Sequence, residues 1–249
     1  MTLRKISNRV YYLPQEDITD RPNLYYVLGD TCSLAIDAGN SKSHVEKFYK
    51  AIEQMGFRLP DYTVITHWHW DHSFGMHAVH GKTITDHKTH QKLTEVMAWE
   101  WTDESMEKRL QSGQEIAMCD RDIRIEYPDR TAIRIVTADV VFQGEMTLYL
   151  GNIRCELKEI SAPHSRDSVI VYIPEEKMLA VGDADCEDHY ENGGRYDPVL
   201  LKNMIDVLEE YDFETYLLGH DVPQSKKDVM EYLRGEYGKL TTQHGRGGL

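Results

Sequence analysis

Apolar positions near the N-terminus gather in short runs that are typical of strands. The runs cover residues 10–13, 23–28 and 32–37, and turn-forming residues bound each of them. Gly29-Asp30 lies between the second and third runs, which predicts a tight hairpin connection. The opening of the chain is therefore expected to form an antiparallel meander.

A helical period follows the meander. Val45, Phe48 and Ile52 fall on one stripe, so residues 41–56 are predicted to form an amphipathic helix. Ser41 or Ser43 is expected to cap its start, and Gly56 to end it. Later apolar runs predict further strands, and two more helices are expected at 197–211 and 224–239. The later strands are expected at 62–66, 82–85, 132–136, 140–142, 147–150, 153–160, 168–173, 178–183 and 215–218.

A charged stretch with strong helix-forming character covers about 87–123 and contains Trp99, Trp101 and Met106. Two or three strands cannot use all of the chain between His72 and His164, so the excess is interpreted as a helical insertion on the side of a candidate site. Its aromatic and methionine side chains are expected to line a lid or to pack the insertion onto the body, with packing favoured for most of them.

Three histidines and one aspartate fall within residues 67–72, where the apolar run 62–66 ends. In extended backbone, positions i and i+2 share a face, so His67 and His69 can reach one ion. Asp71 and His72 follow where the chain turns, and can face a second ion. Imidazole and carboxylate groups bind Zn²⁺, with Fe²⁺ and Mn²⁺ as alternatives. A histidine cluster without a metal is the competing interpretation.

Three later motifs extend this pattern, each after an apolar run: Ala162-Pro163-His164, Val181-Gly182-Asp183 and Leu218-Gly219-His220. In this order, together with His67-x-His69-x-Asp71-His72, they resemble the signature of the metallo-β-lactamase superfamily of metal-dependent hydrolases. The resemblance implies an α+β fold, a four-layer αββα sandwich of two mixed sheets with outer helices. A single domain over residues 1–249 is expected, because the motifs run from His67 to His220.

The resemblance also implies a division of the ligands between two divalent metal ions. His67, His69 and His164 should hold the first ion, Asp71, His72 and His220 the second, and Asp183 should bridge them. A water shared by two such ions becomes a hydroxide near neutral pH, and Asp71 would orient it as the catalytic residue. Asp37 is interpreted either as a supporting residue near the metals or as a strand-end turn residue.

The composition of the chain limits the classes of molecule that it is expected to bind. With 42 acidic and 28 basic residues the formal net charge is −14, which argues against nucleic acid and against an anionic membrane surface. A small-molecule substrate is expected. The first residues lack the apolar core of a secretory signal, and the four cysteines form no CxxC pair, so a cytoplasmic location is expected. Nothing in the sequence specifies an oligomeric state.

The resemblance leaves several functions open. Hydrolysis of a small ester, thioester, lactone or phosphoester is favoured, because no G-x-S-x-G nucleophile motif occurs. The best-known β-lactamases carry Cys at the position of Asp183 and Arg at that of His72, which argues against antibiotic hydrolysis. An iron-dependent oxidoreductase resembling sulfur dioxygenases is the alternative. Cys186 lies three residues after Asp183 and is interpreted either as a soft metal ligand or, preferentially, as a buried or loop cysteine. The loop 184–196 contains His189, Tyr190, Arg195 and Tyr196, which are candidates for substrate contact.

Overall fold

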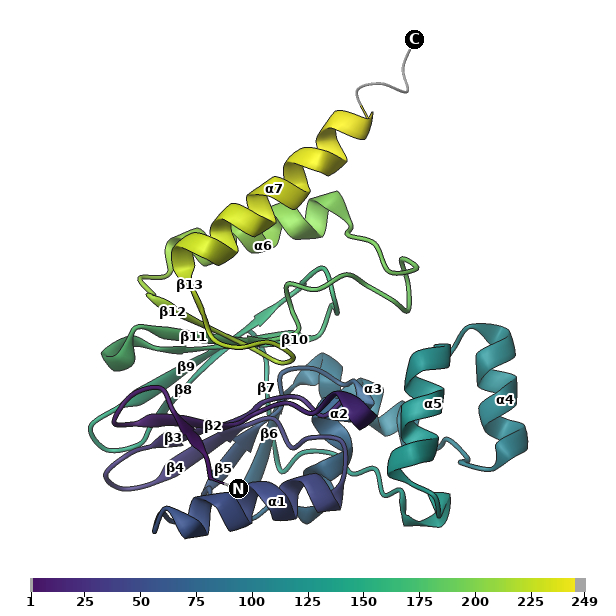
Figure 1. The fold of residues 1–249 in the computed structure, drawn as a ribbon, viewed down its shortest axis with the longest axis horizontal. Helices are drawn as coiled ribbons and strands as arrows, with labels where there is room; N and C mark the ends of the chain where they lie inside the picture. Colours follow the sequence, from purple (N-terminus) through teal and green to yellow (C-terminus); the bar gives the residue numbers. More distant parts are fainter. Residues whose placement is uncertain (1, 245–249) are drawn as a thin grey trace.

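Two β-sheets face each other, with helices on their outer surfaces (Figure 1). The computed structural model describes residues 2–244. In Figure 1, α1 lies against one sheet, while α6 and α7 cover the other. This is the four-layer αββα arrangement expected from the sequence.

The first sheet has seven strands in sequence order within the described residues. Its first four strands are antiparallel, and the remaining pairings are parallel. The Gly29-Asp30 hairpin joins the third and fourth strands as predicted. The strands are β1 (Arg4–Lys5), β2 (Val10–Leu13), β3 (Leu24–Leu28), β4 (Ser33–Ile36), β5 (Tyr62–Val64), β6 (Lys82–Asp86) and β7 (Val140–Phe142).

The second sheet has six strands in the described part of the chain, in the order β13-β12-β11-β10-β9-β8. The β11–β12 pairing is parallel and the others are antiparallel, so this sheet is mixed as well. Its strands are β8 (Glu145–Tyr149), β9 (Arg154–Ile160), β10 (Ser168–Ile173), β11 (Met178–Gly182), β12 (Thr215–Leu218) and β13 (Gln224–Ser225).

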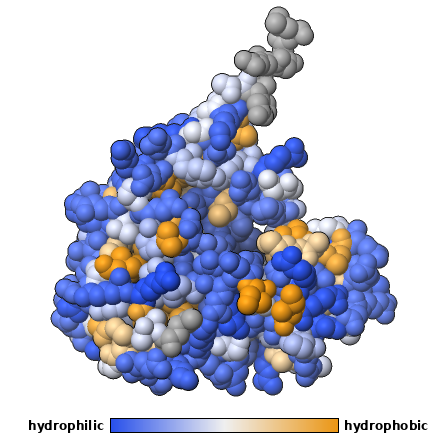
Figure 2. All heavy atoms as spheres, in the orientation of Figure 1, coloured by the Kyte–Doolittle hydropathy of each residue, from blue (hydrophilic) through white to orange (hydrophobic). Residues whose placement is uncertain are grey.

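The main hydrophobic core lies between the sheets, because alternate residues of each strand point to the same side. Val27 and Val64 of the first sheet and Leu157 and Val171 of the second belong to one buried cluster. The outward-facing residues of both sheets pack against helices. On the face drawn in Figure 2 the surface is mostly hydrophilic, with apolar residues in small separate groups.

The outer helices begin at capping side chains. Ser41 accepts a hydrogen bond from the His44 backbone N–H at the start of α1 (Lys42–Gln54), and Asp197 accepts two at the start of α6 (Pro198–Glu210). The last helix is α7 (Lys226–His244). Within residues 2–244, no helix has both the length and the apolar character needed to span a membrane.

The charged helical stretch forms three separate helices. These are α3 (His87–Val96), α4 (Asp103–Ser112) and α5 (Ala117–Glu126). Gly113 ends α4 in the left-handed region at φ 73°, which glycine adopts without strain. Trp99, Trp101 and Met106 pack in one cluster with Trp70 and Phe74, so most of the apolar residues of this stretch do serve packing.

The strand predicted at residues 132–136 is wrong. The chain there forms a short 3-10 helix, η3 (Arg130–Ala132), followed by an irregular segment up to β7. Ile133 and Ile135 are held by side-chain packing. An apolar alternation predicts a strand only where a neighbouring strand supplies hydrogen bonds, and none lies beside this segment in the described structure.

Candidate metal centre

The residues of the histidine and aspartate motifs meet at one edge of the sandwich, where several strands end. The first motif follows β5, which ends at Val64, so His67 and His69 lie in the loop rather than on the strand itself. Asp71 and His72 belong to the short helix α2 (Trp70–Ser73), which is followed by the 3-10 helix η2 (Phe74–Ala78). His164 comes after β9, Asp183 directly after β11 and His220 after β12. Loops at strand ends are a common location for functional sites.

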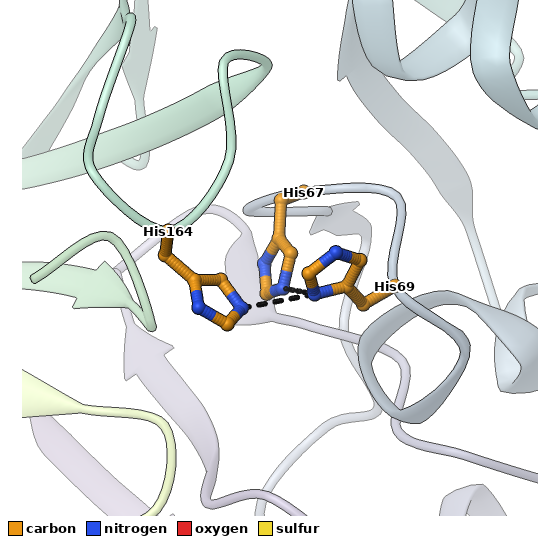
Figure 3. A group of neighbouring side chains, drawn as sticks. All are labelled: His67, His69 and His164. Carbon is orange, nitrogen blue, oxygen red and sulfur yellow. Dashed lines mark hydrogen bonds between the residues drawn. The ribbon is translucent and has the colours of Figure 1, made fainter. Parts of the chain in front are cut away.

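His67, His69 and His164 form a compact triad (Figure 3). The Nδ1 atom of His69 lies 3.0 Å from Nε2 of His67 and 2.9 Å from Nε2 of His164. All three residues are buried. Burial lowers the pKa of His67 and of His69 well below the usual value, which keeps these imidazoles neutral with lone pairs free.

Two of these rings are oriented by hydrogen bonds at the opposite nitrogen. His164 Nδ1 donates to the backbone oxygen of Glu187 at 2.9 Å. His67 Nδ1 lies 3.1 Å from the Thr66 hydroxyl, which itself donates to Asp37. Each bond places the proton away from the triad, so the inward Nε2 atom can act as a ligand.

A second group consists of Asp71, His72, Asp183 and His220. Oδ2 of Asp71 lies 3.0 Å from Nε2 of His72 and 3.0 Å from Nε2 of His220. Oδ2 of Asp183 lies 3.2 Å from Nε2 of His72 and 3.3 Å from Nε2 of His220. Four donor atoms thus converge on one point, as a divalent ion requires.

Asp183 also reaches toward the triad. Its Oδ2 lies 3.9 Å from Nε2 of His164, and its Oδ1 is buried with no hydrogen-bond partner among the described residues. Gly219 makes this approach possible, because a Cβ at that position would lie 1.9 Å from Asp183 Oδ1. A buried carboxylate oxygen without a partner is costly unless a ligand satisfies it, and a metal ion fits that need.

The charges of the second group support the same conclusion. Burial lowers the pKa of His72, but the carboxylates Asp71, Asp183 and Asp37 outweigh it and raise the pKa well above the usual value. Burial also lowers the pKa of His220, and Asp183 and Asp71 again reverse the effect. The carboxylates therefore favour positive charge inside this group, which divalent cations would supply.

Two further aspartates contact the outer ring nitrogens of the two histidines in the second group. Oδ2 of Asp37 lies 2.8 Å from Nδ1 of His72, which favours the supporting role for Asp37 over that of a turn residue. Oδ1 of Asp20 lies 3.5 Å from Nδ1 of His220. Burial, with the Asp71 carboxylate, raises the pKa of Asp20 to about 6. Sequence reasoning missed Asp20, which has no local motif and is far from the other residues in sequence.

The remaining candidates do not join the two groups. Cys186 belongs to neither group, and burial raises the pKa of its thiol well above the usual value. It borders a cavity of about 360 Å³ together with Asp183, His220 and Tyr196. His189 is exposed.

A cleft of about 410 Å³ opens beside the triad and is bordered by His69, His164, Trp68 and Tyr190. Gly113 and Gln114, from the turn between α4 and α5, line it as well. The charged helical stretch therefore borders the cleft. Tyr190, from the loop 184–196, also lines this cleft.

The family model of the metallo-beta-lactamase superfamily matches residues 18–220. No curated protein matches the chain. Among solved structures, a metallo-beta-lactamase from Pontibacter korlensis is 19% identical with a TM-score of 0.62, covering 93% of this chain and 98% of that one. The DIM-1 metallo-beta-lactamase is 16% identical with a TM-score of 0.64, covering 96% and 99%.

A sec-alkylsulfatase, Pisa1 from Pseudomonas sp., is 14% identical with a TM-score of 0.70, covering 99% of this chain and 43% of the sulfatase. The chain thus spans less than half the length of that enzyme, and at these identities the solved structures support the fold alone. The family model covers most of the described residues, and both His/Asp groups lie within the matched range. The chain belongs to the metallo-beta-lactamase superfamily and is a metallo-hydrolase of that fold.

Proposed function

We propose that this protein hydrolyses a small ester, thioester, lactone or phosphoester at a centre of two divalent metal ions, with Zn²⁺ as the preferred metal. The observation that carries the proposal is the position of Asp183. Its Oδ2 lies 3.2 Å and 3.3 Å from the second group's histidines and 3.9 Å from His164 of the triad. A carboxylate between two donor groups can bridge two ions and offset their repulsion.

Two ions held in this way would acidify a shared water to a pKa near neutrality and polarise the bond to be cleaved. The chain's own residues set the geometry. Burial raises the pKa of Asp71, but His72 and His220 outweigh it and hold the pKa below the usual range, so this carboxylate stays ionised. Asp71 can then accept a hydrogen bond from the attacking water and orient it.

The size of the cleft and the charge of the chain limit the substrate. A cleft of about 410 Å³ beside the triad suits a small molecule. The net charge of −14 disfavours a polyanion such as RNA. A β-lactam and a secondary alkyl sulfate belong in the assay panel, because proteins of the same fold are named after activity on such compounds.

The cytoplasmic location expected from the sequence stays a prediction, tested by cell fractionation.

The test is metal analysis followed by a hydrolysis panel on zinc-loaded protein. We expect turnover of at least one ester class, lost on chelation and restored by Zn²⁺ or Mn²⁺. Asp71→Ala should lower turnover by at least about a hundredfold, the scale for removing a key electrostatic group. Asp212→Ala, which removes an exposed aspartate, is the matched control and should change little.

Two outcomes would overturn the proposal. Turnover that survives Asp71→Ala would remove the assigned role of that residue. Purified protein that carries iron, turns over none of the panel and consumes oxygen with a persulfide would replace hydrolysis with the oxidoreductase function.

A further inference from the structure

Two half-buried aromatic side chains, Trp68 and Tyr190, border the cleft beside the metal triad. The Tyr190 ring lies against His69, with centroids 4.8 Å apart and planes at 37°. The Trp68 ring lies 5.4 Å from Tyr190 and 4.8 Å from His69. These two rings, which we call the aromatic wall, therefore continue directly from a metal-binding imidazole into the cleft.

The helical stretch holds Tyr190 in place. The Tyr190 hydroxyl donates to Oε1 of Glu115 at 2.8 Å, and Glu115 is only 6% exposed. The Tyr190 backbone N–H donates to Oδ1 of Asp188 at 2.9 Å. Because the side chain is anchored at its far end and the backbone at its near end, the ring has a defined position before any substrate arrives.

Trp68 is held as well. Its backbone N–H donates to Oδ2 of Asp167 at 2.9 Å. The Lys92 ammonium lies 5.0 Å from its ring centroid, within the range of cation–π attraction. Both rings thus have supports outside the metal centre, although neither is needed to complete the two groups of metal-binding residues.

We propose that the aromatic wall binds a planar, apolar group of the substrate, such as an aryl ring, next to the bond held at the metals. Glu115 acts as the positioning residue for Tyr190. This rests on the proposed function, since it names the substrate class of that site. Aromatic side chains favour offset or edge-to-face contact with another ring, and such contacts add affinity beyond burial of area.

The experiment compares two carboxylates that differ only by an aryl group, acetate and phenylacetate, on Co²⁺-loaded protein. Both can bind the metals through the carboxylate, and the visible spectrum of Co²⁺ reports binding without turnover. For the wild type we expect phenylacetate to bind at least about fivefold more tightly, the scale of one aromatic contact with its burial.

Tyr190→Ala should reduce this preference to less than about twofold, while the affinity for acetate stays close to that of the wild type. Tyr149→Ala is the matched control, because Tyr149 is 74% exposed at the far end of β8. It should keep the full preference. A preference that is absent in the wild type, or unchanged in Tyr190→Ala, would overturn the aromatic wall.

Glu115 is tested by a conservative pair. Glu115→Gln keeps an oxygen that can accept from the Tyr190 hydroxyl and should keep the preference for phenylacetate. Glu115→Ala removes the acceptor and should lower the preference toward that of Tyr190→Ala. Both variants are compared under conditions in which they are equally stable to heat. An equal preference for phenylacetate in the two variants would overturn the positioning role of Glu115.

The result separates this inference from the proposed function. If neither carboxylate perturbs the Co²⁺ spectrum, the protein has no metal centre that a small ligand can reach, and both proposals fail. If both carboxylates bind with equal affinity and the protein still hydrolyses esters, only the aromatic wall fails.

Discussion

Carboxylates on the outer side of the candidate metal-binding imidazoles help to orient these rings. Asp37 contacts Nδ1 of His72 at 2.8 Å and also accepts from the Thr66 backbone N–H and hydroxyl. It is 3% exposed. A partner of this kind fixes the tautomer and the orientation of a histidine ligand.

We expect Asp37→Ala to weaken metal binding at the second group by about 10–100-fold, the range for loss of such a partner. A competition titration with a zinc indicator measures this affinity. Asp37→Asn retains an oxygen that can accept a hydrogen bond from His72, so this variant should lose less metal affinity. An affinity equal to that of the wild type in Asp37→Ala would show that His72 needs no support.

Removal of the bridging carboxylate should separate the two metal sites. In Asp183→Ala we expect the metal content to fall from about two ions per chain toward one, because the bridge offsets the repulsion of two close cations. Mass spectrometry of zinc-supplemented protein gives the stoichiometry. A wild-type value near one, unchanged in the variant, would contradict the two-metal centre.

At the level of elements, strand ends and a short helix position the candidate metal ligands, while capping side chains stabilise the starts of the outer helices. Asp197 caps α6 through its Oδ1, which accepts from the backbone N–H groups of Val199 at 2.8 Å and Leu200 at 3.1 Å. Pro198 follows at the first helical position, where its fixed φ suits a helix start. Helix α6 buries Leu201 and Leu208 in the core beneath it.

Asp197→Ala should therefore lower the free energy of unfolding by about 0.5–2 kcal/mol, the usual cost of losing a cap. Denaturant unfolding of the metal-loaded protein measures the change. Asp206→Ala removes an exposed ion pair with Lys202 on the same helix, and it should change stability by less than about 0.5 kcal/mol. A larger loss of unfolding free energy in Asp206→Ala than in Asp197→Ala would contradict the importance assigned to the cap.

For the whole molecule, the metal centre joins segments from both sheets. Its residues extend from His67 to His220, and they meet only in the folded chain. The unfolded chain cannot present these donors together, so metal binding and folding stabilise each other.

Chelation should therefore lower the melting temperature. At a free metal concentration about 1,000-fold above Kd, the stabilisation is about 4 kcal/mol. For a chain of this length that corresponds to a shift of roughly 8–16 °C. Differential scanning calorimetry with and without chelator measures it, and added Zn²⁺ should restore the original value. An unchanged melting temperature in protein shown to have lost its metal would contradict this coupling.

The sequence alone determined the candidate donors and the strands they follow. His67, His69, Asp71 and His72 are dense enough in sequence to stand out, and short-range patterns predicted α1 and the β3–β4 hairpin. These features depend on neighbouring residues, so the sequence expresses them directly. The same local information failed at residues 132–136, where the alternation had no partner strand.

Only the tertiary structure decided which distant residues touch. Asp20 reaches His220, and Glu115 reaches Tyr190. These contacts join positions that are far apart in the chain and leave no local pattern. They arise because the two sheets pack face to face and bring their strand ends to one edge, which no short stretch of sequence can specify.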